Sequence, residues 1–212
     1  MNTKRIFTII VLMFAVATAI YFYPTPLPEQ MASHWNINGE VDGYMSKLWA
    51  LFLMPILMVV FTVMFFFVPK IDPEKKNIEK FYEEFDSFIL VFNLFMLYLY
   101  ILTILWNIGY SINMTASLMP AFAVLFYSCG SLIGKSKRNY TIGIKLPWTL
   151  ADDTVWDKTH KVGEKLFKLT ALFIFLGTFF PQYAFALMFI PLTASIVYLF
   201  IYSYLEYRKI KK

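Results

Sequence analysis

The sequence predicts an all-α membrane protein with six transmembrane helices, one folded extracytoplasmic loop and one cytoplasmic interfacial helix. The composition is the first reason: the chain has 212 residues, of which 59% are hydrophobic and only 16% are charged. A soluble domain has about a quarter of its residues charged. The second reason is that several apolar runs approach or exceed the roughly 18 to 20 residues with which a helix crosses a bilayer.

Six apolar runs have the character of membrane spans. In chain order they are Ile6–Tyr23, Leu48–Val68, Phe88–Tyr110, Ala116–Ile133, Leu166–Phe180 and Ala184–Leu205. The fifth run is the shortest, and it extends backwards as an amphipathic segment, so we expect a longer helix that starts in the interface. Ala15–Ala19 resembles a signal-peptidase site. We nevertheless expect an uncleaved first helix, because the apolar run continues beyond that site to Tyr23.

The basic residues predict the orientation of these spans. Six spans place both termini and the loops at residues 69–87 and 134–165 on one side of the membrane. Of the 19 Lys and Arg residues, only Lys47 falls on the other side. The positive-inside rule therefore places both termini and the two basic loops in the cytoplasm. This distribution also accounts for the net charge of +5 without direct nucleic-acid binding.

The sequence offers little for catalysis or coupled transport. No ionisable residue lies near the middle of a span, which argues against a small-solute or lipid transporter, the first alternative function. Asn93 and Asn107 are polar, and we expect them to form interhelical hydrogen bonds. The two histidines, His34 and His160, fall on opposite sides, and Cys129 is the only cysteine. We therefore expect no metal, no cofactor and no catalytic residues.

A membrane enzyme is the second alternative function. It would act at the cytoplasmic interface and use His160 with Asp153 or Asp157. No nucleophile accompanies His160 in the sequence.

The extracytoplasmic loop at residues 23–47 has the content of a compact fold. Three prolines begin it, and turn dipeptides follow at residues 38–39 (Asn-Gly) and 42–43 (Asp-Gly). The tripeptide His34-Trp35-Asn36 is a candidate binding site for a peptide or another extracellular ligand. The alternative is that Trp35 anchors in the membrane interface while His34 and Asn36 satisfy backbone groups of the turns.

The cytoplasmic loop at residues 134–165 starts with basic residues that suit lipid phosphates. A short extended piece then ends at Pro147, and a helix begins with Thr149 or Asp152 as its N-cap. Trp156, His160 and Gly163 follow at helical spacing and predict one buried face. We expect this helix to lie in the membrane interface and to continue into the fifth span.

Two segments resemble the SdpI family of bacterial multi-pass membrane proteins. The first is "LPEQMASHWNINGEVDGYMSK", which resembles the family's N-terminal segment with its HWN and G-x-x-D-G elements. The second is "RNYTIGIKLPWTLADDTVWDKTHKVG", which resembles the family's cytoplasmic signature of a P-W-T-L element followed by V-W-x-K-T-H-x-x-G. Lys145 stands in the second segment where an Arg is more usual.

The resemblance implies a location, a function and partners. It implies a protein of the bacterial cytoplasmic membrane, surrounded by lipid, that confers immunity against a secreted, membrane-active toxin peptide. It also implies signalling to a cytoplasmic transcriptional repressor. The matched positions outside are candidates for toxin binding: His34, Trp35, Asn36, Gly39, Asp42 and Gly43. The matched positions inside are candidates for partner binding: Asn139, Gly143, Lys145, Pro147, Trp148, Thr149, Trp156, Lys158, Thr159, His160 and Gly163.

We expect the chain to form one structural unit of three consecutive parts. Residues 1–69 form a first helical pair with the extracytoplasmic loop, residues 70–133 a central helical pair, and residues 134–212 the cytoplasmic loop with the last helical pair. For every residue of the two matched segments a purely structural role remains the alternative to a functional one.

Overall fold

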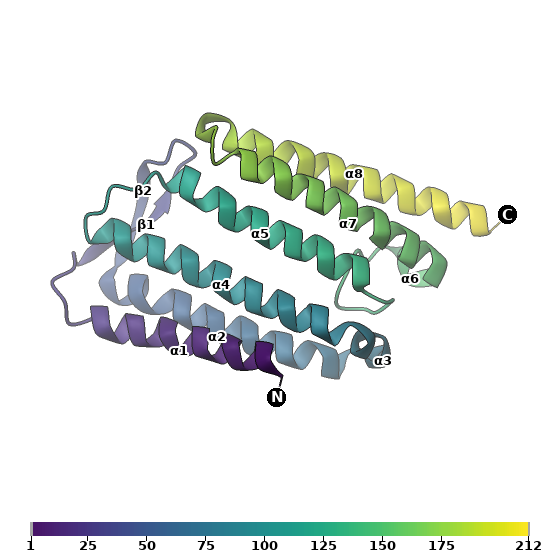
Figure 1. The fold of residues 1–212 in the computed structure, drawn as a ribbon, viewed down its shortest axis with the longest axis horizontal. Coiled ribbons are helices and arrows are strands. Elements are labelled where there is room, and N and C mark those ends of the chain that lie inside the picture. The colour runs from purple at the N-terminus through teal and green to yellow at the C-terminus, as the bar shows by residue number, and fades with distance from the viewer. Residues whose placement is uncertain (1, 212) are drawn as a thin grey trace.

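The computed structural model describes residues 2–211, in which six long helices lie side by side with a β-hairpin at one end (Figure 1). The long helices are α1 (Thr3–Phe22), α2 (Lys47–Ile71), α4 (Tyr82–Asn107), α5 (Met114–Lys135), α7 (Asp153–Leu176) and α8 (Ala184–Ile210). The short helical elements are α3 (Lys75–Ile78), α6 (Pro147–Ala151) and single 3₁₀ turns at Glu79–Phe81 and Pro181–Tyr183.

Five helical stretches are long and apolar enough to cross a membrane, which supports a membrane protein. They are Thr3–Phe22, Lys47–Ile71, Lys75–Asn107, Met114–Lys135 and Pro181–Ile210. The long helix α7 is not one of the five. Charged residues interrupt its first half, and its apolar part begins only at Leu166.

The six long helices pack as two groups of three. The helices α1, α2 and α4 pack on one another, as do α5, α7 and α8, and contact between α4 and α5 joins the groups. Small residues allow the closest approach: a Cβ atom added at Gly130 would lie 3.0 Å from the Glu164 carbonyl oxygen of α7. In the first group, Thr62 of α2 donates a hydrogen bond to Asn93 of α4 over 3.1 Å, as expected for a polar residue of a span.

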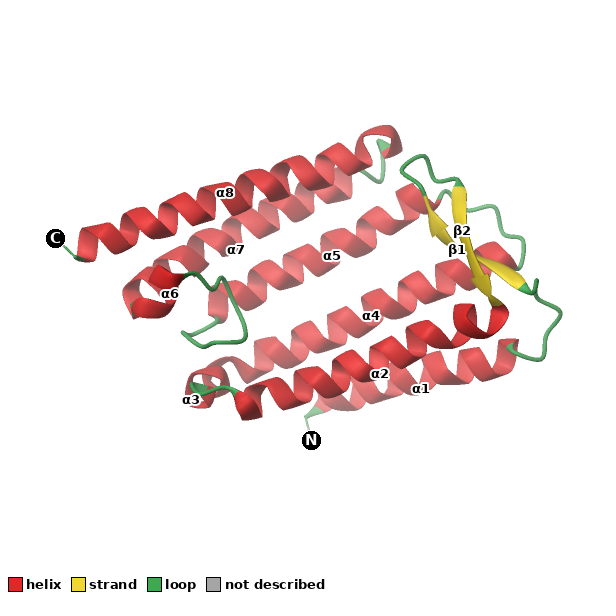
Figure 2. Ribbon diagram, turned by 180° about the vertical axis from the view of Figure 1, so that it is seen from behind, coloured by secondary structure: helices red, strands yellow, loops and turns green. Residues whose placement is uncertain are grey.

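The expectation of an all-α fold was wrong for the loop that follows α1. This loop forms an antiparallel hairpin of β1 (Gln30–Trp35) and β2 (Val41–Ser46), as Figure 2 shows. Met31 of β1 is fully buried among residues of α1, α2 and α4. A two-stranded hairpin is marginal alone in water, so this packing on the helix ends stabilises it.

The helix that was predicted to lie in the membrane interface is the first half of α7. It is parallel to the other long helices of the bundle and does not cross them, as a helix lying along the membrane surface would. Asp152 is its N-cap, because its Oδ1 accepts hydrogen bonds from the Thr154 and Val155 amides at 2.8 and 3.0 Å. The helix then runs alongside α8 for its whole length in both views (Figures 1 and 2). The extended piece expected before Pro147 forms no strand, and Pro147 begins the short helix α6.

Candidate functional site

The two matched segments lie at opposite ends of the bundle. We call these the hairpin end, which carries β1 and β2, and the terminal end, which carries both chain termini, α3 and α6 (Figure 1). The toxin-binding candidates are all at the hairpin end, and the partner-binding candidates are all at the terminal end. The structure therefore brings each set together and separates the two sets by the length of the helices.

At the hairpin end, Asn36 and Gly39 build the turn between the strands. The Asn36 Oδ1 accepts hydrogen bonds from the Asn38 and Glu40 amides at 2.9 and 3.1 Å. Gly39 has a φ of +79°, a conformation that costs a residue with a side chain about 1 kcal/mol or more. Both residues therefore contribute to the geometry of the turn.

His34 and Asp42 form an exposed polar pair on the hairpin. The His34 Nδ1 and Asp42 Oδ1 atoms are 2.5 Å apart, and 72% and 46% of the two side chains are exposed. Gly43 makes room for this pair, since a Cβ atom there would lie 2.9 Å from the His34 Cβ. Of the candidates at this end, His34 and Asp42 are the two exposed residues, so their polar groups are open to a ligand.

Trp35 and Asn107 attach the hairpin to α4. The Trp35 ring meets the edge of Trp106, with ring centroids 5.8 Å apart. Asn107 accepts a hydrogen bond from the Ala32 amide at 2.8 Å and donates one to the Ala32 carbonyl at 3.0 Å. Asn107 thus pairs with β1 as a neighbouring strand would. The sequence predicted a polar contact for Asn107 between helices, and this partner was missed.

At the terminal end, Asn139 shapes the turn that precedes α6. Its side chain is fully buried and accepts hydrogen bonds from the Thr141 and Ile142 amides at 2.9 and 2.6 Å. Its Nδ2 donates to the Lys137 and Ile142 carbonyl oxygens at 2.7 and 2.8 Å. One side chain therefore satisfies four backbone groups, of which the two of Ile142 are buried and would otherwise cost stability.

Gly143 lies against the stacked rings of Trp156 and His160. These rings are 3.9 Å apart and nearly parallel, and both residues are at most 1% exposed. Gly143 has a φ of +130°, and a Cβ atom there would lie 2.6 Å from the His160 Nε2. The Trp156 Nε1 donates a hydrogen bond to the Ser136 carbonyl at 3.1 Å. The loop thus closes on α7 only because residue 143 lacks a side chain.

Both ring nitrogens of His160 are occupied. The Ile144 amide donates a hydrogen bond to Nε2 at 2.9 Å, so Nδ1 carries the proton and donates to the Trp156 carbonyl at 2.7 Å. Burial lowers the pKa of His160 from 6.5 to about 4, against smaller opposing effects of the Trp156 carbonyl and of Asp157. His160 is therefore neutral at physiological pH, and it holds the loop rather than presenting a base to a substrate.

The Pro147-Trp148-Thr149 corner connects the same loop to α8. The buried Thr149 hydroxyl accepts a hydrogen bond from the Leu146 amide at 2.8 Å and donates one to the Ile144 carbonyl at 2.8 Å. The Trp148 Nε1 donates to Ser203 of α8 over 2.5 Å, and its ring packs against Phe200 and Tyr204. Trp148 is thus a structural contact between α6 and α8.

The remaining candidates of the terminal end differ in exposure. Lys158 donates a hydrogen bond to Glu206 of α8 at 2.7 Å, and Lys145 is exposed at the surface. Thr159 and Gly163 are buried on α7. A Cβ atom at Gly163 would lie 2.7 Å from the Ile144 Cδ1, so Gly163 makes room for the loop.

Sequence reasoning missed Asp72, which joins the two terminal-end loops. Its Oδ2 accepts hydrogen bonds from the Tyr140 amide at 3.0 Å and from the Thr141 hydroxyl at 2.7 Å. Asn77 adds a hydrogen bond to the Arg138 carbonyl at 2.8 Å. Asp72 directly follows the end of α2 and is 3% exposed. A single Asp at a helix end gives no sign of a partner so far along the chain.

Comparison with known proteins shows what the chain is similar to. Residues 135–203 match the sequence model of the SdpI/YfhL protein family. The chain is also 26% identical over 208 residues to "Immunity protein SdpI" of Bacillus subtilis (strain 168). These aligned residues make up 98% of this chain and 97% of that protein. The chain is thus similar to the SdpI/YfhL family over its C-terminal third and to an immunity protein along nearly its whole length. No solved structure matches it.

The match to the SdpI/YfhL family contains every partner-binding candidate, since all of them lie between residues 139 and 163. The hairpin lies in a second match, residues 8–59, to a family described as "Domain of unknown function (DUF1648)". In the SdpI/YfhL segment, most candidates are buried and connect the loop, α6, α7 and α8. The exposed candidates are Lys145, Pro147 and Lys158.

Proposed function

We propose that this chain is a membrane immunity protein that protects the cell that makes it against a secreted, membrane-active toxin peptide. The observation that carries the proposal is the similarity to an immunity protein along nearly the whole of both chains. The name of that relative is also that of a protective protein and not of an enzyme. The occupied ring nitrogens of buried His160 favour the same conclusion.

In this proposal the chain crosses the cytoplasmic membrane six times, because α7 also spans it in addition to the five long apolar stretches. Its apolar part from Leu166 onward packs between α5 and α8, where its polar first half continues past the membrane surface. The distribution of Lys and Arg supports a cytoplasmic terminal end, since of these residues only Lys47 lies near the hairpin. The hairpin is then on the outer face.

The hairpin is the surface that would meet the toxin. Its exposed His34–Asp42 pair offers a donor and an acceptor, and Asn107 connects β1 directly to the outer end of α4. A toxin that binds the hairpin would therefore act on the position of α4 through the contact between Asn107 and β1. At the opposite end, Gly143 packs against the stacked rings of Trp156 and His160, and this contact fixes the loop that carries the exposed Lys145. This loop is the surface that we assign to a cytoplasmic repressor.

Survival of toxin-treated cells tests the proposal. Bacillus subtilis cells that lack their own immunity protein SdpI become sensitive to the toxin. Expression of this chain in these cells should restore their survival. The His34→Ala/Asp42→Ala variant should protect less, so that about tenfold less toxin kills the cells, as expected when a small polar binding contact is lost.

The matched control is Glu29→Ala, which removes one exposed charge at the base of the hairpin and should leave protection unchanged. Membrane abundance of each variant is measured by immunoblot. If the unaltered chain is abundant in the membrane and gives no more survival than an empty vector, the immunity proposal is wrong.

A further inference from the structure

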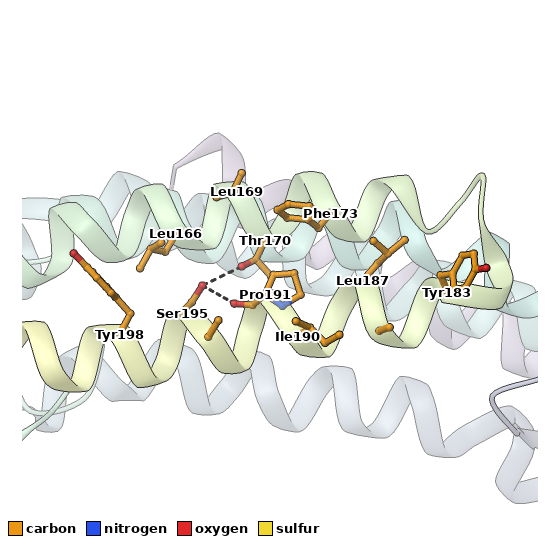
Figure 3. Close-up of a pocket in the computed structure, with 12 residues that line it drawn as sticks. Leu166, Leu169, Thr170, Phe173, Tyr183, Leu187, Ile190, Pro191, Ser195 and Tyr198 are labelled. Carbon is orange, nitrogen blue, oxygen red and sulfur yellow. Dashed lines mark hydrogen bonds between the residues drawn. The ribbon is translucent and has the colours of Figure 1, made fainter.

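An apolar groove of about 660 Å³ lies between α7 and α8. Figure 3 shows it with Tyr183 at one end and Tyr198 at the other. Between these two tyrosines the polar side chains bond within the protein: the Ser195 hydroxyl donates a hydrogen bond to the Pro191 carbonyl at 2.7 Å and lies 3.4 Å from the Thr170 hydroxyl. The rest of the lining between the tyrosines is apolar, so the groove suits an apolar chain.

The groove has the length of a lipid acyl chain in one leaflet. Ala186 and Tyr198 both line it on α8. Twelve helical steps separate them, which corresponds to about 18 Å at 1.5 Å per residue. One leaflet contributes about half of the roughly 30 Å of bilayer hydrocarbon.

A basic surface continues the groove toward the terminal end. On α7, Lys158, Val162, Lys165 and Leu169 follow one another at intervals of four, three and four residues and so share one side of the helix. Leu169 lines the groove, so the two exposed lysines lie on the side that leads out of it.

On α8 the groove also continues toward basic residues. Tyr198 stacks on Tyr202 with ring centroids 5.9 Å apart. Tyr202 in turn lines a second hollow of about 330 Å³ with Leu205, Glu206, Arg208 and Lys209.

The charges of this surface favour an anion. Glu206 is its one acid, and it is already bound to Lys158 at 2.7 Å and to Lys209 at 2.5 Å. Among the described residues, Lys165 forms no ion pair within 4.0 Å, and the side chain of Lys209 is 68% exposed. A second copy of the chain would be a poor occupant, because parallel copies would bring their basic ends together.

We propose that an anionic phospholipid occupies this site, with one acyl chain in the α7–α8 groove and its phosphate between Lys165 and Lys209 beside Tyr202. Lysine side chains extend along apolar helix surfaces and place their ammonium groups at the headgroup level, as this arrangement needs. The site requires only that the chain lie in a membrane, so it stands apart from the immunity proposal.

Native mass spectrometry of the purified full-length chain, with phosphatidylglycerol or phosphatidylcholine of identical acyl chains, tests the site. The chain should retain one phosphatidylglycerol more tightly than one phosphatidylcholine. The Lys165→Gln/Lys209→Gln variant should lose about 30-fold in phosphatidylglycerol affinity, since each of the two lysines near a membrane surface contributes about 1 kcal/mol. Lys75→Gln/Lys76→Gln, which removes the same charge from α3, should bind as the unaltered chain does.

A second pair of variants tests the groove itself. Ala194→Phe fills the groove and should weaken retention of both lipids, whereas Ile196→Phe, on the opposite side of α8, should not. Equal retention of the two lipids by the unaltered chain would overturn the proposal. So would an equal loss in the two lysine variants, or a dimer in the same spectra that Ala194→Phe abolishes.

Discussion

Replacing Gly143 with Ala is expected to lower the free energy of unfolding by about 3 kcal/mol, because a strained φ and an overpacked contact add together. The φ of +130° is one that residues with a side chain rarely adopt. The added methyl group would also lie 2.6 Å from the His160 Nε2 and 2.9 Å from Trp156. Neither neighbour can move away easily, since both rings are buried and hydrogen-bonded. Equilibrium unfolding in mixed micelles measures the loss.

Gly109→Ala separates the two causes. Gly109 also has a positive φ, of +98°, but a Cβ atom there would have no neighbour within 4 Å. This variant should therefore lose only the backbone contribution, about 1 kcal/mol. An equal loss in the two variants would show that the loop does not pack on the Trp156–His160 pair as described.

The unaltered protein is expected to lose about 2 kcal/mol of stability between pH 7 and pH 5 through His160. The unfolded imidazole binds a proton near pH 6.5, whereas burial lowers the folded pKa to about 4. Between these values the unfolded state binds more protons, so stability is highest above pH 6.5 and falls as the pH decreases toward 4. Unfolding measured at pH 7, 6 and 5 gives the slope.

Two variants assign that slope to His160. His160→Gln should be less stable at pH 7 by about 2 kcal/mol, because the Ile144 amide loses the well-placed acceptor of its hydrogen bond. This variant should also lack the part of the pH slope that His160 causes. His34→Ala removes the other, exposed histidine and should keep the slope. A slope that persists unchanged in His160→Gln would mean that a different group causes it.

Composition and helical periodicity predicted much of the fold, because the bilayer leaves few alternatives to long apolar helices. The six expected runs each coincide with part of a long helix, and α7 continues from Asp152 into the fifth run. The hairpin was missed because six-residue strands rich in polar residues carry a weak periodic signal. Its stability depends on partners far away in sequence, such as Asn107.

The candidate residues were found by motif, but their roles required the structure. Trp156, His160 and Gly163 were expected on one buried face, and all three are buried. His160 accepts a hydrogen bond from the Ile144 amide. This bond depends on the path of a loop without regular structure, which no sequence periodicity predicts. Asp72 was missed for the same reason, because it bonds to Tyr140 in that loop. The ion pair of Arg5 on α1 with Asp86 on α4, at 2.9 Å, joins residues 81 positions apart and was also not predicted.

The proposed function requires that the hairpin and the partner-binding candidates face opposite sides of the membrane, because the toxin surface and the repressor surface both depend on this orientation. Cysteine labelling tests this in a Cys129→Ala background with a maleimide that does not cross membranes. Asn38→Cys, at the exposed tip of the hairpin, should be labelled in intact Bacillus subtilis cells. Lys76→Cys, exposed at the terminal end, should be labelled only after the cells are permeabilised. Labelling of both variants in intact cells, or of Lys76→Cys alone, would contradict this orientation.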